Sequence, residues 1–356
     1  MKSIEDYVNL EPQYYQSVLD NYQSLFGDKF TKDEVMKFDN VVIYATGSSS
    51  NAAYGALPFM SKILKMPVRI EEPSISENYL LNVKKNTLCL AISQGGHSYS
   101  VVKLIERLQE AGHKVYTLTS ELDSPVAKIS KNLLLMGMPV EEMPYVSAGY
   151  SVEILDLLLI TLTIASVKNQ ITSVCYQKYL TELTSIMQAM PSVIKRSSQW
   201  VDLHLSEFSN AQRIMFIGYG AAYGVSREGE TKITEAVRIS SWGKELEEYM
   251  HGPYLGLKHD DFVICLEPNG KLQKRQELLQ QFLNKHIEHV YSIYAGVAQN
   301  LGSHDLSLQV ETNELLSALF MTVPVHLLAY RLSQKKGIDL QRSAYPDFDE
   351  ITASKI

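Results

Sequence analysis

The stretch Ser226–Pro253, SREGETKITEAVRISSWGKELEEYMHGP, is the part of the sequence around which fold and function can be argued. It begins with a helical pattern in which Glu228, Lys232 and Glu235 are spaced by four and three residues. At about 100° per residue, these side chains fall on one stripe of a helix. The stripe could be a surface salt-bridge ladder or a set of chemically active groups. A glycine-rich loop before the helix and His251-Gly-Pro after it weaken the first interpretation.

Composition predicts an ordinary globular protein with room for two domains. The chain has 356 residues, of which 45% are hydrophobic and 21% charged. A net charge of −7 gives no indication of a nucleic-acid or membrane partner. The three cysteines have no CxxC spacing and the first residues lack a signal-peptide pattern, so we expect reduced thiols in a cytoplasmic protein. The apolar run 154–165 contains Asp156 and is too short to span a bilayer, which predicts a buried helix.

Strand-like and helical segments alternate along the chain. This alternation predicts an α/β fold with parallel sheets that helices cover on both faces. The expected strands are 37–45, 68–70, 87–92, 114–118 and 132–136, then 213–217, 261–266, 289–293 and 306–310.

Four of these strands recur at nearly constant offsets of 172, 175, 175 and 174 residues, which indicates an internal duplication. We therefore expect two similar domains with further segments around them. The predicted segments are a lead-in helix (1–26), a first domain (27–170), a helical linker (171–198), a second domain (199–335) and a polar tail (336–356).

Two loops that follow strands of the first domain are rich in glycine and hydroxyl groups, Thr46–Ser50 and Ser93–Ser98. Ligands of open parallel sheets lie at the carboxyl ends of strands. Helix N-terminal amides and serine hydroxyls there would suit a phosphate monoester. Both loops could also be ordinary helix caps. A dinucleotide site is a weaker alternative, because the third glycine of the loop 218–224 comes one position late for G-x-G-x-x-G.

These motifs resemble those of the double SIS-domain (sugar isomerase) family. The chain is similar to the isomerase half of glucosamine-6-phosphate synthase and to fructosamine-6-phosphate deglycases. The resemblance implies two SIS domains, each a parallel sheet flanked by helices in a flavodoxin-like three-layer sandwich. It also implies that the two loops bind a sugar phosphate. The matching loop residues are Thr46, Gly47, Ser48, Ser49, Ser93, Gln94, Gly96 and Ser98.

Two positions of the second loop depart from the family pattern. Gly95 replaces a serine, which removes one hydroxyl donor, and His97 stands where the synthases have a glutamate. Tyr150 falls near a lysine of the synthases and has no assigned role. Val146 lies in the segment that, by resemblance, lines the sugar pocket.

The opening stretch resembles the family's E-G-x-x-K-x-x-E run. By that resemblance Glu235 is the base that moves a proton between C1 and C2, and Lys232 beside it would keep the carboxylate ionised. His251 matches a histidine that helps to open the sugar ring and comes from a neighbouring subunit, which implies a homodimer or higher oligomer. Lys355 matches a lysine of a C-terminal tail that closes over the sugar.

The expected function is deglycation of a fructosamine-type sugar 6-phosphate to hexose 6-phosphate and free amine, since no glutaminase segment precedes the matching region. Phosphosugar isomerisation, or glucosamine-6-phosphate synthesis or deamination with free ammonia, is an alternative. A non-catalytic phosphosugar sensor is another. No metal-ligand spacing is present, and we expect no cofactor.

Overall fold

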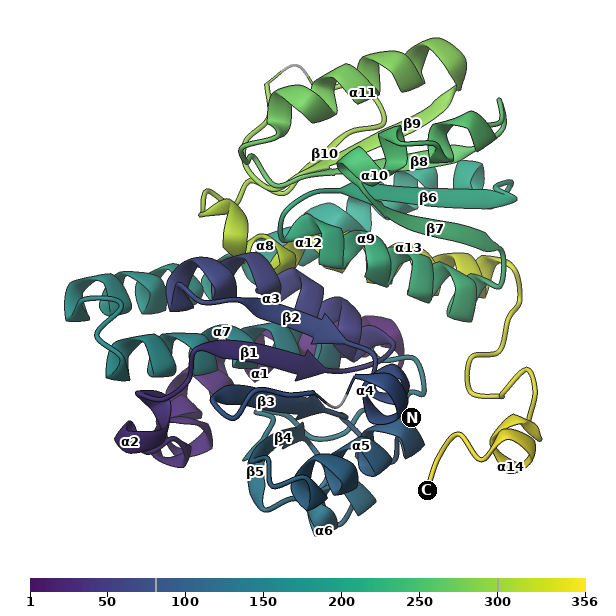
Figure 1. Ribbon diagram of the computed structural model, residues 1–356. Helices are drawn as coiled ribbons and strands as arrows, with labels where there is room; N and C mark the ends of the chain where they lie inside the picture. Colours follow the sequence, from purple (N-terminus) through teal and green to yellow (C-terminus); the bar gives the residue numbers. More distant parts are fainter. Residues whose placement is uncertain (81, 300) are drawn as a thin grey trace. The chain divides into compact units, whose positions relative to one another are not determined.

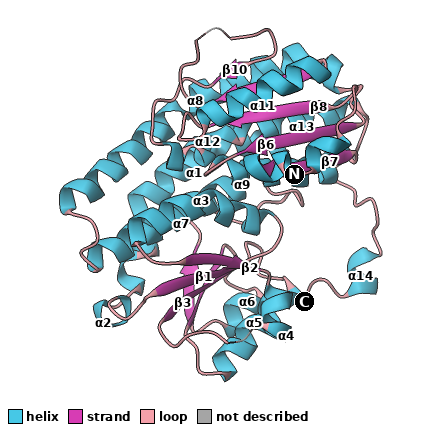
Figure 2. Ribbon diagram, turned by 45° about the horizontal axis from the view of Figure 1, so that its top comes forward, coloured by secondary structure: helices cyan, strands magenta, loops and turns pink. Residues whose placement is uncertain are grey.

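The computed structural model describes residues 1–80, 82–299 and 301–356, which form two compact units, each with its own sheet. The first-sheet unit comprises Gln13–Glu142, Val152–Thr181 and Arg342–Ile356. The second-sheet unit comprises Met1–Pro12, Met143–Ser151 and Glu182–Gln341. Figures 1 and 2 show that helices cover both faces of each sheet. The α/β class and the flavodoxin-like parallel sheets predicted from the sequence are therefore confirmed.

All strands of the first sheet are parallel, in the order β2-β1-β3-β4-β5. Helices α3 and α7 lie on one face, and α4, α5 and α6 lie on the other (Figure 1). The strands are β1 (Asn40–Tyr44), β2 (Val68–Glu71), β3 (Thr87–Ile92), β4 (Val115–Thr119) and β5 (Asn132–Leu135). The helices in this part of the sequence are α1 (Ile4–Leu25), α2 (Lys32–Val35), α3 (Ser48–Leu64), α4 (Pro73–Tyr79), α5 (Tyr99–Glu110), α6 (Pro125–Ile129), α7 (Ala148–Val167) and α8 (Ser173–Phe208). Of these, α1, α7 and α8 contribute residues to both units.

The second sheet is also parallel, in the order β7-β6-β8-β9-β10. Helices α9 and α13 lie on one face, and α10 and α11 lie on the other. The strands are β6 (Arg213–Gly218), β7 (Ser240–Glu245), β8 (Phe262–Glu267), β9 (His289–Tyr294) and β10 (Leu306–Ser307). The helices are α9 (Ala222–Lys232), α10 (Leu246–Met250), α11 (Gln273–His286), α12 (Ala318–Met321), α13 (Val323–Lys335) and α14 (Phe348–Thr352), the last of which belongs to the first-sheet unit.

The two sheets have the same strand order, as the constant offsets predict. One strand was missed: β7, which begins at Ser240 and occupies the edge position that β2 has in the first sheet. Its residues, SSWGKE, contain few β-branched side chains and gave no strand signal. The offset could have located it, because Ser240 lies 172 residues after Val68.

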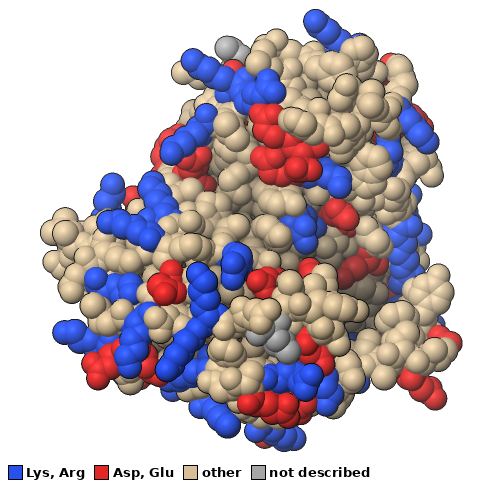
Figure 3. Space-filling view, in the orientation of Figure 1, with Lys and Arg blue, Asp and Glu red and all other residues tan. Residues whose placement is uncertain are grey.

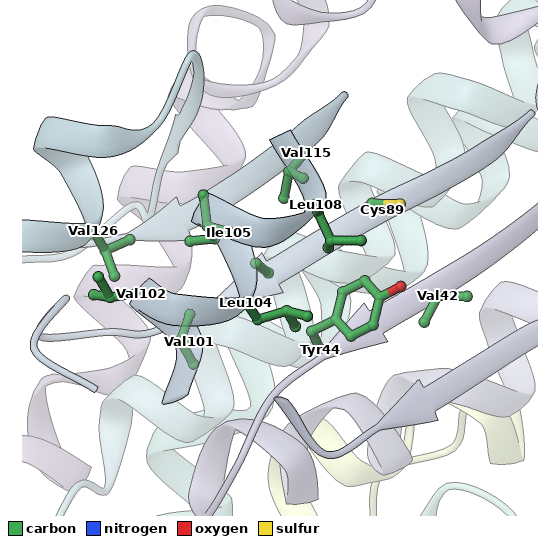
Figure 4. Packing of buried hydrophobic residues seen from close by; sticks show 11 residues of the cluster. Val42, Tyr44, Cys89, Val101, Val102, Leu104, Ile105, Leu108, Val115 and Val126 are labelled. Atoms are coloured by element: carbon green, nitrogen blue, oxygen red, sulfur yellow. The ribbon is translucent and has the colours of Figure 1, made fainter. Parts of the chain in front are cut away.

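Each sheet packs an apolar face against helices. In the first sheet, Val42, Tyr44, Cys89 and Val115 pack against one side of α5, which contributes Val101, Leu104, Ile105 and Leu108 (Figure 4). The second sheet has an equivalent cluster that includes Met215, Ile217, Val263 and Cys265. Cys89 and Cys265 are free and fully buried, and burial raises the pKa of each thiol to about 12. Both therefore act as core residues, as predicted.

Among the described residues, α7 is the one helix long and apolar enough to cross a membrane by length and composition, and 89% of that apolar window is buried inside the protein. The helix carries Asp156, which is fully buried. Burial and, secondarily, the neighbouring Glu153 raise the pKa of Asp156 well above its usual range, while the Gly137 backbone partly opposes this rise.

We expect Asp156→Asn to stabilise the protein at pH 8 and to change it little at pH 4. Because folding raises this pKa, the stability falls as the pH rises from the unfolded-state value of about 4 towards the folded-state value. At pH 8, removing the ionisable group should therefore raise the free energy of unfolding by about 1–3 kcal/mol. Thermal unfolding between pH 4 and 8 measures the gain, with the exposed Asp123→Asn as control. An equal gain at both pH values would contradict the explanation.

Candidate functional site

Helix α9 lies unusually close to the second sheet, and two glycines make this possible. A Cβ atom on Gly229 would lie 2.6 Å from the Phe216 ring of β6. A Cβ atom on Gly243 of β7 would lie 2.2 Å from the Ser226 carbonyl oxygen of α9. Because no larger side chain fits at these contacts without a shift, the glycines allow the close approach of the helix to the sheet.

Charged residues of α9 and of the turn after it form an ion-pair cluster, of which two members are fully buried. The Lys232 Nζ atom lies 2.8 Å from Glu235 Oε2 and 3.6 Å from Glu228 Oε1. The side chains of Lys232 and Glu228 are 0% exposed, whereas that of Glu235 is 40% exposed. The surface-ladder interpretation is therefore wrong, because two of the three groups lie in the core. Glu235 is the member of the cluster that solvent, and hence a ligand, can reach.

Glu235 lies on a π-helical turn, Ile233–Val237, that directly follows α9. The Arg238 amide donates to the Ile233 carbonyl oxygen five residues earlier, at 2.9 Å. Arg238 then adopts a left-handed conformation with φ of 61° and ends the helix. Such single wide turns occur often at functional sites. Sequence spacing predicted a regular helix here and gave no signal for the wider turn.

Sequence analysis also missed a histidine that joins this cluster. His326 of α13 is fully buried, and its Nε2 atom lies 3.4 Å from Glu228 Oε1. The Tyr150 ring packs edge-on against His326, with ring centroids 5.9 Å apart. His326 lies in an apolar stretch of sequence far from Glu228, so no local pattern could have found it.

His251 and Val146 lie elsewhere in the same unit. His251 ends α10, is exposed, and its Nδ1 atom lies 2.9 Å from the Glu247 carbonyl oxygen. Gly252 follows with φ of 128°, a conformation that suits glycine, and Pro253 opens a short 3₁₀ turn. Val146 is half-buried just before α7. His251 and Glu235 thus have separate hydrogen-bond partners.

The first predicted phosphate loop connects β1 to α3. Thr46 and Gly47 are exposed, and Ser48 and Ser49 are half-buried at the first turn of the helix. Ser49 Oγ donates to Glu153 Oε2 at 2.9 Å. This hydroxyl would therefore have to rotate away from a carboxylate in order to donate to a phosphate, a feature that the sequence did not indicate.

The second predicted loop connects β3 to α5. Gly96 has φ of 69°, and a Cβ atom there would lie 2.1 Å from Ser124 Oγ, so only glycine fits. Gly95 has open space around it, so a side chain would be accommodated there. Ser93 and Gln94 are buried, and Ser98 Oγ lies 3.4 Å from Ser100 Oγ.

Two buried donors at these loops lack a hydrogen-bond partner among the described residues. They are Gln94 Nε2 in the second loop and Ser50 Oγ at the start of α3. A buried polar group left without a partner is costly, so such groups commonly mark a position for a ligand or a water molecule.

The last residues of the sequence lie against the second loop. The Ile356 amide donates to the His97 carbonyl oxygen at 3.0 Å, and His97 Nδ1 lies 2.7 Å from the Ile356 carbonyl oxygen. The first amide of α5, that of Tyr99, donates to the Ser354 carbonyl oxygen at 3.3 Å. Lys355 pairs with Ser98 in an antiparallel bridge, and its Nζ atom lies 3.0 Å from Asp349 Oδ2. The first-sheet unit thus brings Lys355 to a predicted phosphate loop.

Within residues 1–80, 82–299 and 301–356, no group of three or more His, Cys, Asp or Glu side chains is arranged to hold a metal ion.

We expect Lys232→Met to destabilise the protein by about 3–5 kcal/mol, because it leaves the Glu228 carboxylate buried without its cation. The double variant Lys232→Met/Glu228→Gln should recover most of this loss. Urea denaturation measures both, with the exposed Lys274→Met as control. A double variant no more stable than Lys232→Met alone would show that the buried charge is not the cause.

We expect His97→Ala to loosen the tail. Losing the hydrogen bond to Ile356 should speed amide exchange of residues 348–356 by about fivefold, the effect of roughly 1 kcal/mol. Hydrogen–deuterium exchange of that peptide measures the change, and His113→Ala, beyond the C-terminal end of α5, serves as control. Unchanged exchange in His97→Ala would mean that the backbone bonds alone hold the tail.

Comparison with known proteins agrees with this architecture. A family model described as the SIS domain matches residues 35–165 and 207–334. Among curated relatives, the glutamine–fructose-6-phosphate aminotransferase (isomerizing) of Bacteroides thetaiotaomicron is 24% identical over 87% of this chain and 51% of its own length. That of Caldanaerobacter subterraneus is 23% identical over 92% of this chain and 53% of its own length. The chain thus spans about half the length of these relatives.

Solved structures share the whole fold. A Clostridium difficile protein assigned as a phosphosugar isomerase superposes with a TM-score of 0.91, at 24% identity, and the match covers 100% of this chain and 99% of that one. The C-terminal domain of glucosamine-fructose-6-phosphate aminotransferase from Francisella tularensis gives 0.84, at 20% identity, over 95% and 98% of the two chains. Because the two segments that match the SIS-domain model make up most of the sequence, the chain belongs to the SIS-domain family.

Proposed function

We propose that this protein is an enzyme that processes an amino-substituted sugar 6-phosphate, with Glu235 as the base. One observation carries the proposal: a fully buried ammonium, that of Lys232, lies 2.8 Å from a carboxylate that remains 40% exposed. The ammonium fixes one oxygen of Glu235 by a direct contact, while the carboxylate stays accessible. A base that abstracts a carbon-bound proton needs these properties.

We propose that the two loops of the first sheet bind the phosphate. The N-termini of α3 and α5 supply backbone amides, except that of Tyr99, which donates to Ser354, and Gln94 Nε2 and Ser50 Oγ supply buried donors without partners among the described residues. Charged side chains of both signs are interspersed over the visible face of the molecule (Figure 3). Local donors, rather than a basic surface, would therefore bind the anion.

The proposed reaction is deglycation. Glu235 removes a proton from C1 of the open-chain ketose, whose C1 carries the amine, and an enaminol forms. Return of a proton to C2 gives an imine at C1. Water adds to this imine, the C–N bond breaks, and hexose 6-phosphate and a free amine are released. We propose that His251 assists ring opening and that Lys355, carried by the tail, closes over the sugar.

Relatives favour a second candidate within the same chemistry. The names of the curated relatives describe amino transfer to fructose 6-phosphate with isomerisation. A Thermotoga maritima structure described as glucosamine-6-phosphate deaminase superposes with a TM-score of 0.75, at 20% identity, over 96% of each chain. Synthesis or deamination of glucosamine 6-phosphate with free ammonia, or simple aldose–ketose isomerisation, would use the same base.

We further propose that the protein works as a cytoplasmic homodimer in which His251 serves the neighbouring subunit. His251 is exposed at the end of α10 and has a different hydrogen-bond partner from Glu235. Both features are compatible with such sharing. A strict monomer on size-exclusion chromatography with light scattering would contradict it.

Incubation of the purified protein with fructoselysine 6-phosphate or glucoselysine 6-phosphate should release hexose 6-phosphate, measured by a coupled dehydrogenase assay.

Glu235→Gln should lower turnover by at least about 100-fold, the usual contribution of a general base, while substrate affinity is retained. Glu230→Gln serves as a matched control on α9, where the Glu230 carboxylate accepts from the Gly243 amide.

Turnover of fructose 6-phosphate with ammonia, or of glucosamine 6-phosphate, without release from either adduct would favour the second candidate. Phosphosugar binding without any turnover would favour the sensor.

A further inference from the structure

Two donors converge on one buried carboxylate oxygen. Glu228 Oε1 lies 3.6 Å from Lys232 Nζ and 3.4 Å from His326 Nε2, and all three side chains are fully buried. His326 reaches the cluster from α13, which packs against both α9 and the π turn that carries Glu235. The order of contacts is therefore His326, Glu228, Lys232 and Glu235, from the core to the accessible end: His326–Glu228 and Lys232–Glu235 are hydrogen bonds, and Glu228–Lys232 is an ion pair.

The state of His326 follows from its surroundings. Burial lowers the pKa of this imidazole, despite opposition from Glu228, so the ring is neutral near pH 7. The charged groups that face it are Glu228 and Lys232 of α9 and Glu235 of the π turn, and the Tyr150 ring packs on it from α7. A neutral ring has one proton, and only a proton on Nε2 can be donated to Glu228. Nδ1 is then a buried acceptor without a hydrogen-bond partner among the described residues.

One ammonium serves two carboxylates in this cluster. The more firmly another donor satisfies Glu228, the less that carboxylate draws Lys232 away from Glu235. We propose that His326 is a positioning residue that donates to Glu228 and so leaves the Lys232 ammonium to Glu235. This inference rests on the proposed role of Glu235 as base, but the hydrogen bond itself can be tested without turnover.

The first test observes the imidazole directly. In protein labelled with ¹⁵N-histidine, with signals assigned by His326→Gln, His326 should show the neutral tautomer protonated at Nε2 from pH 6 to 8. Glu228→Gln should weaken this preference, and Thr322→Val, at the residue that precedes α13 and four positions before His326, should leave it unchanged. The Nδ1-protonated tautomer, or a doubly protonated ring near pH 7, would overturn the proposal whether or not the enzyme has the proposed activity.

The second test compares variants of opposite expected effect. In His326→Leu, Glu228 loses a donor and draws Lys232 from Glu235, so the acid limb of the pH profile of kcat/KM should move up by about half to one pH unit. In Glu228→Gln the carboxylate that competes for Lys232 is gone, so the acid limb of the kcat/KM profile should move to lower pH. His326→Gln, which keeps a donor near Nε2, should stay within about twofold of the parent protein at pH 6.

Shifts of the same sign in His326→Leu and Glu228→Gln, or an unshifted limb in a folded His326→Leu protein, would refute the positioning role. If His326→Leu does not fold, the comparison of Glu228→Gln with His326→Gln still decides. An acid limb that fails to move down in Glu228→Gln, or that moves in His326→Gln, would contradict the proposal.

Discussion

The structure of the candidate site depends on one constraint: an ammonium group lies in the core between two carboxylates. Lys232 can be buried only because Glu228 and Glu235 compensate its charge, and because Gly229 and Gly243 let α9 approach the sheet. Two charged groups, Lys232 and Glu228, are thus desolvated in the arrangement that holds a third, Glu235, at the surface. An arrangement of this kind contributes little to net stability, and if Glu235 is the base that we propose, it preorganises that group.

The two halves share a sheet but carry different groups at the carboxyl ends of their strands. In the first half, short loops rich in glycine and hydroxyls lead into α3 and α5. In the second half, the Tyr219 hydroxyl donates to Glu267 at 2.5 Å, and Glu267 also accepts from the Asn269 amide. Here the protein's own acidic group occupies the backbone donors. The two halves therefore share the order of the sheet but differ in the hydrogen bonding of the loops that follow its strands.

Most of the fold could be predicted from the sequence, because buried parallel strands are continuous apolar runs and the duplication repeats them. The strand β7 escaped because its edge position tolerates SSWGKE. In the candidate site, the spacing of Lys232 and Glu235 was visible, since it is local. His326 was not, because its contact with Glu228 spans 98 residues and leaves no periodic signal. The contact of the tail with His97 was missed for the same reason, because it joins residues 97 and 356. The π turn is local, but its residues have no pattern that distinguishes it from a regular helix.

The π turn at Ile233–Val237 has a further consequence for how this sequence can change. A turn of this type contains one residue more than an α-helical turn, so it is equivalent to a single insertion that the helix has absorbed. Deleting one residue there would restore regular winding and rotate the side chains between the deletion and Arg238, where the helix ends, by about 100° about the helix axis. The number of residues between Lys232 and Ser240, the first residue of β7, therefore constrains the sequence as strongly as the identity of Lys232 does. At positions of this turn other than Glu235, a substitution should therefore disturb the site less than a change in the length of the turn.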